Sequence, residues 1–138
     1  MDEELFEFES DRAFVMSGRG IVFVGRVREG FASVGDRVQV DEKGVHFVGM
    51  IQGIEHSRKL IDKTISGTEL GLLLGNFSNT EVGEILSLAS QGDLGPDSKF
   101  VQAEFAKRGI MFPVVLSLAP NGRHVGLWES MLKLIGLK

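Results

Sequence analysis

The chain contains no cysteine, and this absence removes several kinds of chemistry at once. Disulfide bonds, thiolate metal sites and cysteine nucleophiles are all excluded. A chain without disulfides suits a reducing compartment, so we expect a cytoplasmic protein. The sequence also lacks any apolar run near the roughly 20 residues that a membrane-spanning helix needs. We therefore expect no membrane partner.

Positive charge is scarce where targeting or nucleic-acid binding would need it. Residues 1–11 hold only acidic charges, unlike the basic start of a signal peptide. The formal net charge of -4 argues against a broad nucleic-acid surface, which needs clustered Lys and Arg to displace counterions from phosphates. The net charge does not exclude a local basic face, whose candidate members are Arg12, Arg19, Arg26, Arg28, Arg58 and Lys59.

Catalytic motifs are missing as well. No window matches the GxxxxGK[ST] phosphate-binding loop, so we expect no GTP or ATP binding. His46, His56 and His124 lie far apart and show no HExxH spacing, so the sequence predicts no metal site. No GxSxG motif indicates a nucleophilic serine, and the carboxylates are scattered as on a solvated face. We expect no enzymatic activity and no cofactor.

What the sequence does contain is typical of a small all-β domain. Its 138 residues include 18 glycines and short Val-, Ile- and Phe-rich runs separated by turn residues. Two pairs of runs predict hairpins, one around residues 18–20 and one around residues 41–44, because each connection carries a glycine suited to a tight turn. Apolar runs at residues 70–74 and 85–88 add two further strands. Six short strands predict a six-stranded closed antiparallel barrel.

The segment QGDLGP at residues 91–96 contains several helix and strand breakers, which indicates a linker. We therefore divide the chain into a barrel at residues 1–90 and a C-terminal extension at residues 91–138. The extension is expected to contain one or two strands and a short helix. Residues 100–105 alternate loosely, and residues 111–118 contain Pro113, which favours an edge strand.

The predicted C-terminal helix has one apolar stripe. Leu127, Trp128, Met131, Leu132, Leu134 and Ile135 recur at intervals of three and four residues. Such a short helix is unstable alone, so the stripe should dock on the barrel, on a second copy or on a partner. The candidate residues for a partner or homodimer contact are Trp128, Met131, Leu132 and Ile135.

Two long segments resemble domain 2 of elongation factor Tu and related translation GTPases. They are SGRGIVFVGRVREGFASVGDRVQV at residues 17–40 and GIEHSRKLIDKTISGTELGLLL at residues 53–74. The similarity continues into residues 86–105, which resemble the connector and the first strand of the family's third domain. The resemblance implies a closed β-barrel without the GTPase domain that makes the family enzymatic.

The resemblance also implies a site. In the family a pocket on the barrel rim holds the aminoacyl-adenosine end of transfer RNA, and its motif positions fall here on Asp11, Phe14, Met16, Glu55 and Arg58. By that carry-over Glu55 accepts a ribose hydroxyl, Phe14 and Met16 cover a base, and Arg58 meets a phosphate. The chain departs from the family pattern at Arg12, Ser57 and Gly75. The alternative is structural: Glu55 and Arg58 pair at a strand end, and Phe14 belongs to the core.

Two functions follow from these observations. The first is a non-catalytic, translation-associated binding module that engages a transfer RNA end, a ribosomal element or a translation GTPase. The second is a protein–protein interaction module unrelated to translation, including an antagonist or immunity-type protein. The net negative charge favours a protein partner over a nucleic acid.

Overall fold

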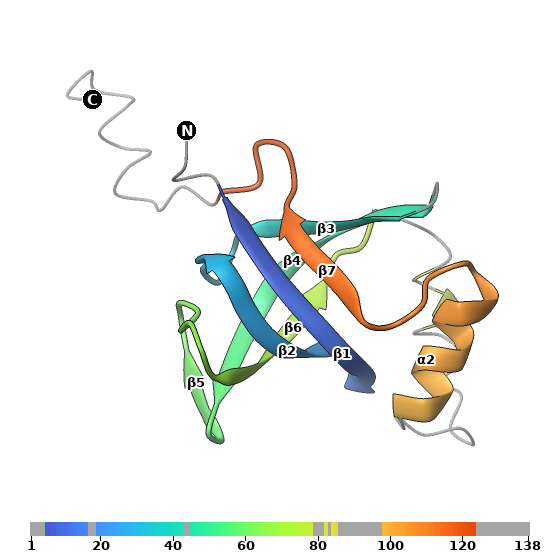
Figure 1. Cartoon of the computed structure of the whole chain (residues 1–138), viewed down its shortest axis with the longest axis horizontal. Coiled ribbons are helices and arrows are strands. Elements are labelled where there is room, and N and C mark those ends of the chain that lie inside the picture. The colour runs from blue at the N-terminus through green and yellow to red at the C-terminus, as the bar shows by residue number, and fades with distance from the viewer. Residues whose placement is uncertain are drawn as a thin grey trace.

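The computed structural model describes residues 5–16, 19–42, 45–78, 82, 84–85 and 98–123 of the chain. The elements are the strands β1 to β7 and the helix α2 (Figure 1), and their bounds are β1 Phe6–Met16, β2 Gly20–Gly30, β3 Arg37–Glu42, β4 Val45–His56, β5 Lys59–Ile61, β6 Glu69–Gly75, α2 Ser98–Lys107 and β7 Val114–Leu118.

Six strands close into an antiparallel ring. The neighbour order is β3-β7-β1-β2-β6-β4, and β4 pairs back onto β3 to complete the circle. β5 pairs with β4 and lies outside this ring. Closure satisfies the backbone groups that an open sheet would expose at its edges. The predicted all-β class with a six-stranded closed antiparallel barrel is confirmed.

Both predicted hairpins are present, because their turns are local and their strands are rich in β-formers. Met16 pairs with Gly20 across the first turn, and β3 pairs with β4 across the second. Gly20 has a φ of 156°, and a Cβ there would collide with the carbonyl oxygen of Leu74. A glycine is therefore required at this position by the close approach of β6.

The sixth strand of the ring comes from a different segment than the sequence predicted. Ile85, assigned above to a strand, is helical and fully buried, and residues 86–88 lie outside the described residues. β7 takes the place in the ring, pairing with β1 on one side and β3 on the other. The ring thus uses residues beyond position 90, which the sequence analysis placed in the extension.

The expected edge strand around Pro113 is also corrected. β7 starts at Val114, directly after the proline, so the missing N–H of Pro113 removes no bond from the ladder. Val114 and Leu116 are fully buried in the barrel core. A strand that begins after its proline can be paired on both sides.

Residues 98–107 form α2, not the strand suggested by their loose alternation and by the resemblance. Val101 and Phe105 are four residues apart, so a helix places both on one face, and both are fully buried. Gly109, with a φ of 91°, ends the helix, and the Ile110 N–H donates to the Phe105 carbonyl at 3.0 Å. This is a Schellman-type stop.

α2 covers one end of the barrel (Figure 1). Its Phe105 side chain is fully buried among aromatic rings of the core. The centroid of the Phe105 ring lies 6.0 Å from that of Phe23, 6.0 Å from that of Phe47 and 5.8 Å from that of Phe112. These rings extend the main core, which the inward residues of the ring strands fill. Burial against the barrel, more than helix propensity, stabilises a helix of this length.

A buried carboxylate, Glu104, pairs with two basic side chains near the C-terminal end of α2. Glu104 accepts hydrogen bonds from Arg108 at 2.9 Å and from Lys107 at 3.1 Å. The Arg108 guanidinium, followed by the Lys107 ammonium, holds the pKa of Glu104 below its usual range.

No helix among the described residues is long and apolar enough to cross a membrane.

Candidate functional site

A bulge in β1 decides which of its side chains face outward. The pairing of β1 with β2 shifts register between Ser10 and Arg12, which leaves Asp11 as the extra residue. Before the bulge Phe6, Phe8 and Ser10 face the core; after it Ala13 and Val15 do. The buried Ser10 hydroxyl lies 3.0 Å from both the Val24 and the Arg12 carbonyl oxygens, so the irregular site keeps a hydrogen bond.

Because of this shift, Phe14 and Met16 face outward instead of into the core. They belong to an apolar cluster on the outside of the barrel. They pack against Val22, Val24 and Leu73, and this cluster is separate from the main core. Phe14 pairs across the sheet with Val22, and Val22 pairs with Leu73. We call this set the outer cluster.

Two glycines extend the outer cluster into a hollow. Gly53 on β4 pairs with Leu73, and Gly71 on β6 pairs with Glu55. With no side chains at these two positions, the sheet surface is open between the outer cluster and β5. Leu60 of β5, 81% exposed, stands at the far side.

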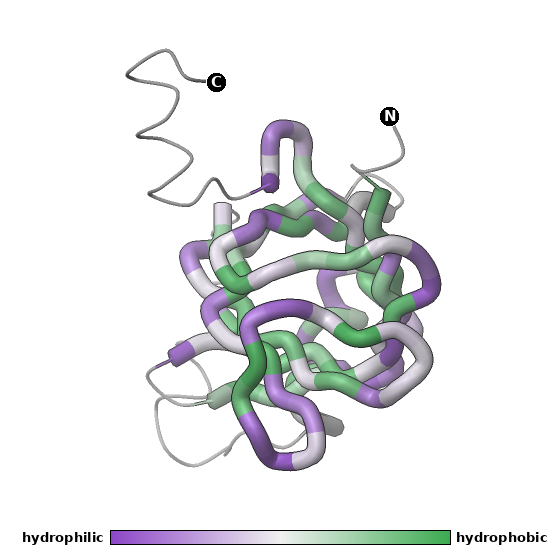
Figure 2. Tube along the Cα trace, turned by 90° about the vertical axis from the view of Figure 1, so that its left-hand side faces the viewer, coloured by the Kyte–Doolittle hydropathy of each residue, from purple (hydrophilic) through white to green (hydrophobic). Residues whose placement is uncertain are grey.

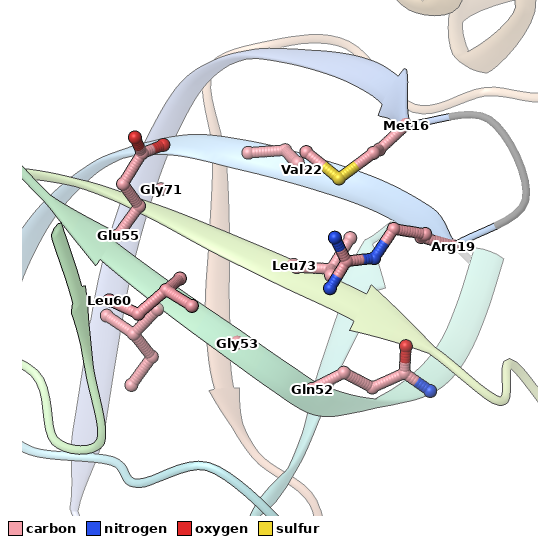
Figure 3. A pocket seen from close by; sticks show the side chains of 10 residues that line it. Met16, Arg19, Val22, Gln52, Gly53, Glu55, Leu60, Gly71 and Leu73 are labelled. Carbon is pink, nitrogen blue, oxygen red and sulfur yellow. The ribbon is translucent and has the colours of Figure 1, made fainter. Parts of the chain in front are cut away.

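The result is a groove made of two adjoining hollows that share Val22, Glu55 and Gly71. Their volumes are about 110 Å³ and 280 Å³. Figure 3 shows the smaller hollow, with Arg19 and Gln52 at one end, Glu55 at the other, and Met16 across from Leu60. We call the two hollows together the outer groove.

Arg58 reaches the larger hollow from a strained turn. It lies with Ser57 in the two-residue connection between β4 and β5, next to the pair His56–Lys59. Ser57 has a φ of 51° and Arg58 a φ of 68°, the left-handed region that a type I′ turn requires. Non-glycine residues cost roughly 1–2 kcal/mol each in that region. Backbone strain of this kind often accompanies a functional position.

Glu55 and Arg58 are both exposed and both line the larger hollow. Within the described part of the chain no ion pair joins them. Phe14 belongs to the outer cluster and not to the main core. In these two respects the described residues differ from the structural alternative.

The basic residues converge only in part. Arg12, Arg19 and Arg58 line the outer groove, whereas Arg26 lines a neighbouring hollow. Arg12 pairs with Asp11 at 3.2 Å and with Glu69 at 3.5 Å, so part of its charge is balanced by the protein itself. Arg28 and Lys59 are exposed but line none of these hollows.

The structure thus brings together four of the five site residues implied by the resemblance: Phe14, Met16, Glu55 and Arg58. The fifth, Asp11, projects from the bulge into the neighbouring hollow. The candidate partner-binding residues Trp128, Met131, Leu132 and Ile135 lie outside the described residues.

Sequence reasoning missed the groove-forming residues Gly53, Gly71 and Leu60. A glycine inside a strand can mark a close approach of another group or a missing side chain on a surface. Two such glycines on neighbouring strands were a usable signal. Arg19 and Gln52 carried no comparable signal, because only the folded sheet brings the turn that holds Arg19 and the middle of β4 to one end of the hollow (Figure 3).

Metal-binding geometry does not occur in the described segments, where no group of three His, Asp or Glu side chains is placed to hold an ion. His46 lies 3.1 Å from Gln39 and His56 lies 3.4 Å from Thr68, each measured from the ring Nε2 to an oxygen. His124 lies outside the described residues.

No protein-family model matches the chain. Among solved structures, a bacterial selenocysteine-specific elongation factor, EF-Sec, matches 86% of this chain at 21% identity with a TM-score of 0.52. Translation elongation factor SelB from Methanococcus maripaludis, in its apo form, matches 85% at 19% identity with a TM-score of 0.54. The chain spans only 15% and 19% of those two chains. At this identity the likeness concerns the fold alone, and that fold is the β-barrel of the translation-factor domain 2 type.

Proposed function

We propose that this chain is a non-catalytic binding module associated with translation, and that its outer groove receives the single-stranded end of a transfer RNA. The observation that carries the proposal is the convergence of Phe14, Met16, Glu55 and Arg58 on one groove. The structural neighbours named above are both translation elongation factors, which supports this choice of process.

The groove offers the three kinds of contact that an unpaired nucleotide needs. The half-buried Phe14 and Met16 present an apolar surface to a base. The exposed Glu55 carboxylate can accept a ribose hydroxyl, and the exposed Arg58 guanidinium can donate to a phosphate. Single-stranded RNA is the form whose bases are free to enter such a hollow.

The proposal is tested by fluorescence anisotropy with labelled transfer RNA and with a single-stranded acceptor-end oligonucleotide over a range of salt concentrations. Loss of one phosphate contact should reduce the slope of log affinity against log salt by about 0.7 for a single strand. Arg58→Ala should lower both affinity and slope.

Arg37→Ala is the matched control, because Arg37 is an exposed arginine on β3 that lines neither hollow. It should bind like the unmodified protein. Equal binding by Arg58→Ala and Arg37→Ala would show that the outer groove is not the RNA site. Absence of binding at micromolar concentration would overturn the function itself.

A protein partner is the second candidate, and Leu60 favours it. This leucine is 81% exposed at the wall of the groove, where it would be buried by an apolar side chain of a partner such as a translation GTPase. Capture from cell extract that survives nuclease treatment and is lost in Leu60→Ser would favour the protein partner over RNA.

A further inference from the structure

Three exposed apolar residues lie at or next to the end of the barrel where β1 begins and β2 ends. They are Leu5, 45% exposed, Phe31, 37% exposed, and Ile65, 43% exposed. Figure 1 shows this end of β1 and β2 on the side of the barrel away from α2. Figure 2, which views the molecule from the left-hand side of Figure 1, shows hydrophobic and hydrophilic segments intermixed on that side. We call Leu5, Phe31 and Ile65 the end patch.

Backbone contacts hold the members of the end patch close together. Leu5 lies against Gly30, the residue before Phe31, since a Cβ on Gly30 would meet the Leu5 carbonyl oxygen. On the other side, Thr64 exchanges two bonds with Ala32: its N–H donates at 2.8 Å and its Oγ1 accepts at 3.0 Å. The residues adjoining these contacts are Phe31 and Ile65.

The described chain ends on this same patch. Arg123, its last residue, has its guanidinium carbon 4.3 Å from the centroid of the Phe31 ring. Its Nη1 donates to the Phe31 carbonyl at 3.0 Å and to the buried Asp36 carboxylate at 3.1 Å. The Arg37 N–H also donates to the Gly122 carbonyl at 2.7 Å. The described part of the chain therefore ends beside the end patch.

The next 15 residues, 124–138, lie outside the described residues and carry the amphipathic pattern that includes Trp128 and Ile135. From position 123 to Trp128 the chain spans at most about 18 Å, at roughly 3.3–3.6 Å per residue. The apolar stripe is thus tethered within reach of an apolar patch of its own chain. A tethered segment meets its site at a far higher effective concentration than a free partner does.

We propose that residues 124–138 dock in cis on the end patch, with Trp128 against Ile65. The docked segment covers the three exposed side chains and removes its own apolar stripe from water. The end patch and the outer groove share no residue, so this inference stands or falls independently of RNA binding.

The sequence supplies its own reporter, because Trp128 is the only tryptophan in the chain. The emission maximum and the acrylamide quenching of the full chain are compared with those of a peptide of residues 120–138. We expect a blue-shifted emission and a lower quenching constant in the full chain. Ile65→Glu should shift both values toward those of the peptide.

Met111→Glu is the matched control, since Met111 is also an exposed apolar residue, 61% accessible, but lies between α2 and β7. It should leave the Trp128 signal unchanged, and circular dichroism should show both variants folded. Trp128 emission equal to that of the peptide, or unaffected by Ile65→Glu, would overturn the proposal. A signal that changes with protein concentration would assign the stripe to a second copy and overturn docking in cis.

Discussion

Filling the floor of the outer groove should separate binding from stability. Gly53 lies on β4 in an ordinary backbone conformation, and a Cβ there would meet only Leu73 side-chain atoms at 3.9 Å, a normal contact distance. A Cβ therefore fits at Gly53 without a collision, and Gly53→Val extends from it into the groove. Glycine inside a strand is destabilising by roughly 0.5–1 kcal/mol relative to alanine. The free energy of unfolding should stay unchanged or rise slightly.

Affinity for an acceptor-end oligonucleotide should fall, because the valine occupies space in the smaller hollow, which Met16 and Val22 also line. If one base is displaced from its apolar surface, the loss is about 1–3 kcal/mol, or roughly 5- to 150-fold in Kd. Anisotropy gives the affinity, and urea unfolding followed by circular dichroism gives the stability. Ser117→Val on β7, outside the groove, controls for adding bulk to a strand. A stable Gly53→Val protein with unchanged affinity would refute the reasoning.

Two further predictions concern α2. Phe105→Ala should lower the free energy of unfolding by about 3–5 kcal/mol, because it empties a fully buried ring site between Phe23 and Phe47. Met111→Ala, at an exposed position, is the control and should change the free energy of unfolding by less than about 0.5 kcal/mol. Equal unfolding midpoints of the two variants in urea would show that α2 is not part of the core. The pKa of Glu104 is lowered in the folded protein, chiefly by Arg108. The ionised carboxylate therefore stabilises the fold at pH values above the pKa that Glu104 has in the unfolded chain. This contribution disappears as the pH falls through the lower pKa of the folded protein. Glu104→Gln should therefore lower the melting temperature at neutral pH and match the unmodified protein near pH 2 or so; a constant difference at all pH values would contradict this.

The sequence by itself determined the features that depend on local interactions. The two predicted hairpins form as expected, because β-rich runs flank turns whose glycines tolerate the required backbone angles. The apolar run at residues 70–74 forms most of β6 and is buried. The carry-over from the resemblance also identified four residues of the outer groove, since a motif fixes positions within strands whose order is conserved by the fold type.

Only the tertiary structure decided which segment closes the ring and which covers its end. Residues 114–118 become a central strand because the gap between β1 and β3 needs a partner, and that requirement comes from pairing at long sequence separation. Residues 98–107 become a helix because the barrel end can bury Val101 and Phe105 together on one face. Neither segment has a local pattern strong enough to override these contacts.

The bulge at Asp11 is the clearest case of a feature settled by tertiary pairing. Side chains in a strand alternate between two faces, so one extra residue moves every later side chain to the opposite face. That single shift sends Phe14 and Met16 outward to the groove and Ala13 and Val15 inward to the core. The alternation of β1 alone gives the two faces, but only its pairing with β2 and the packing of the core determine where the extra residue falls.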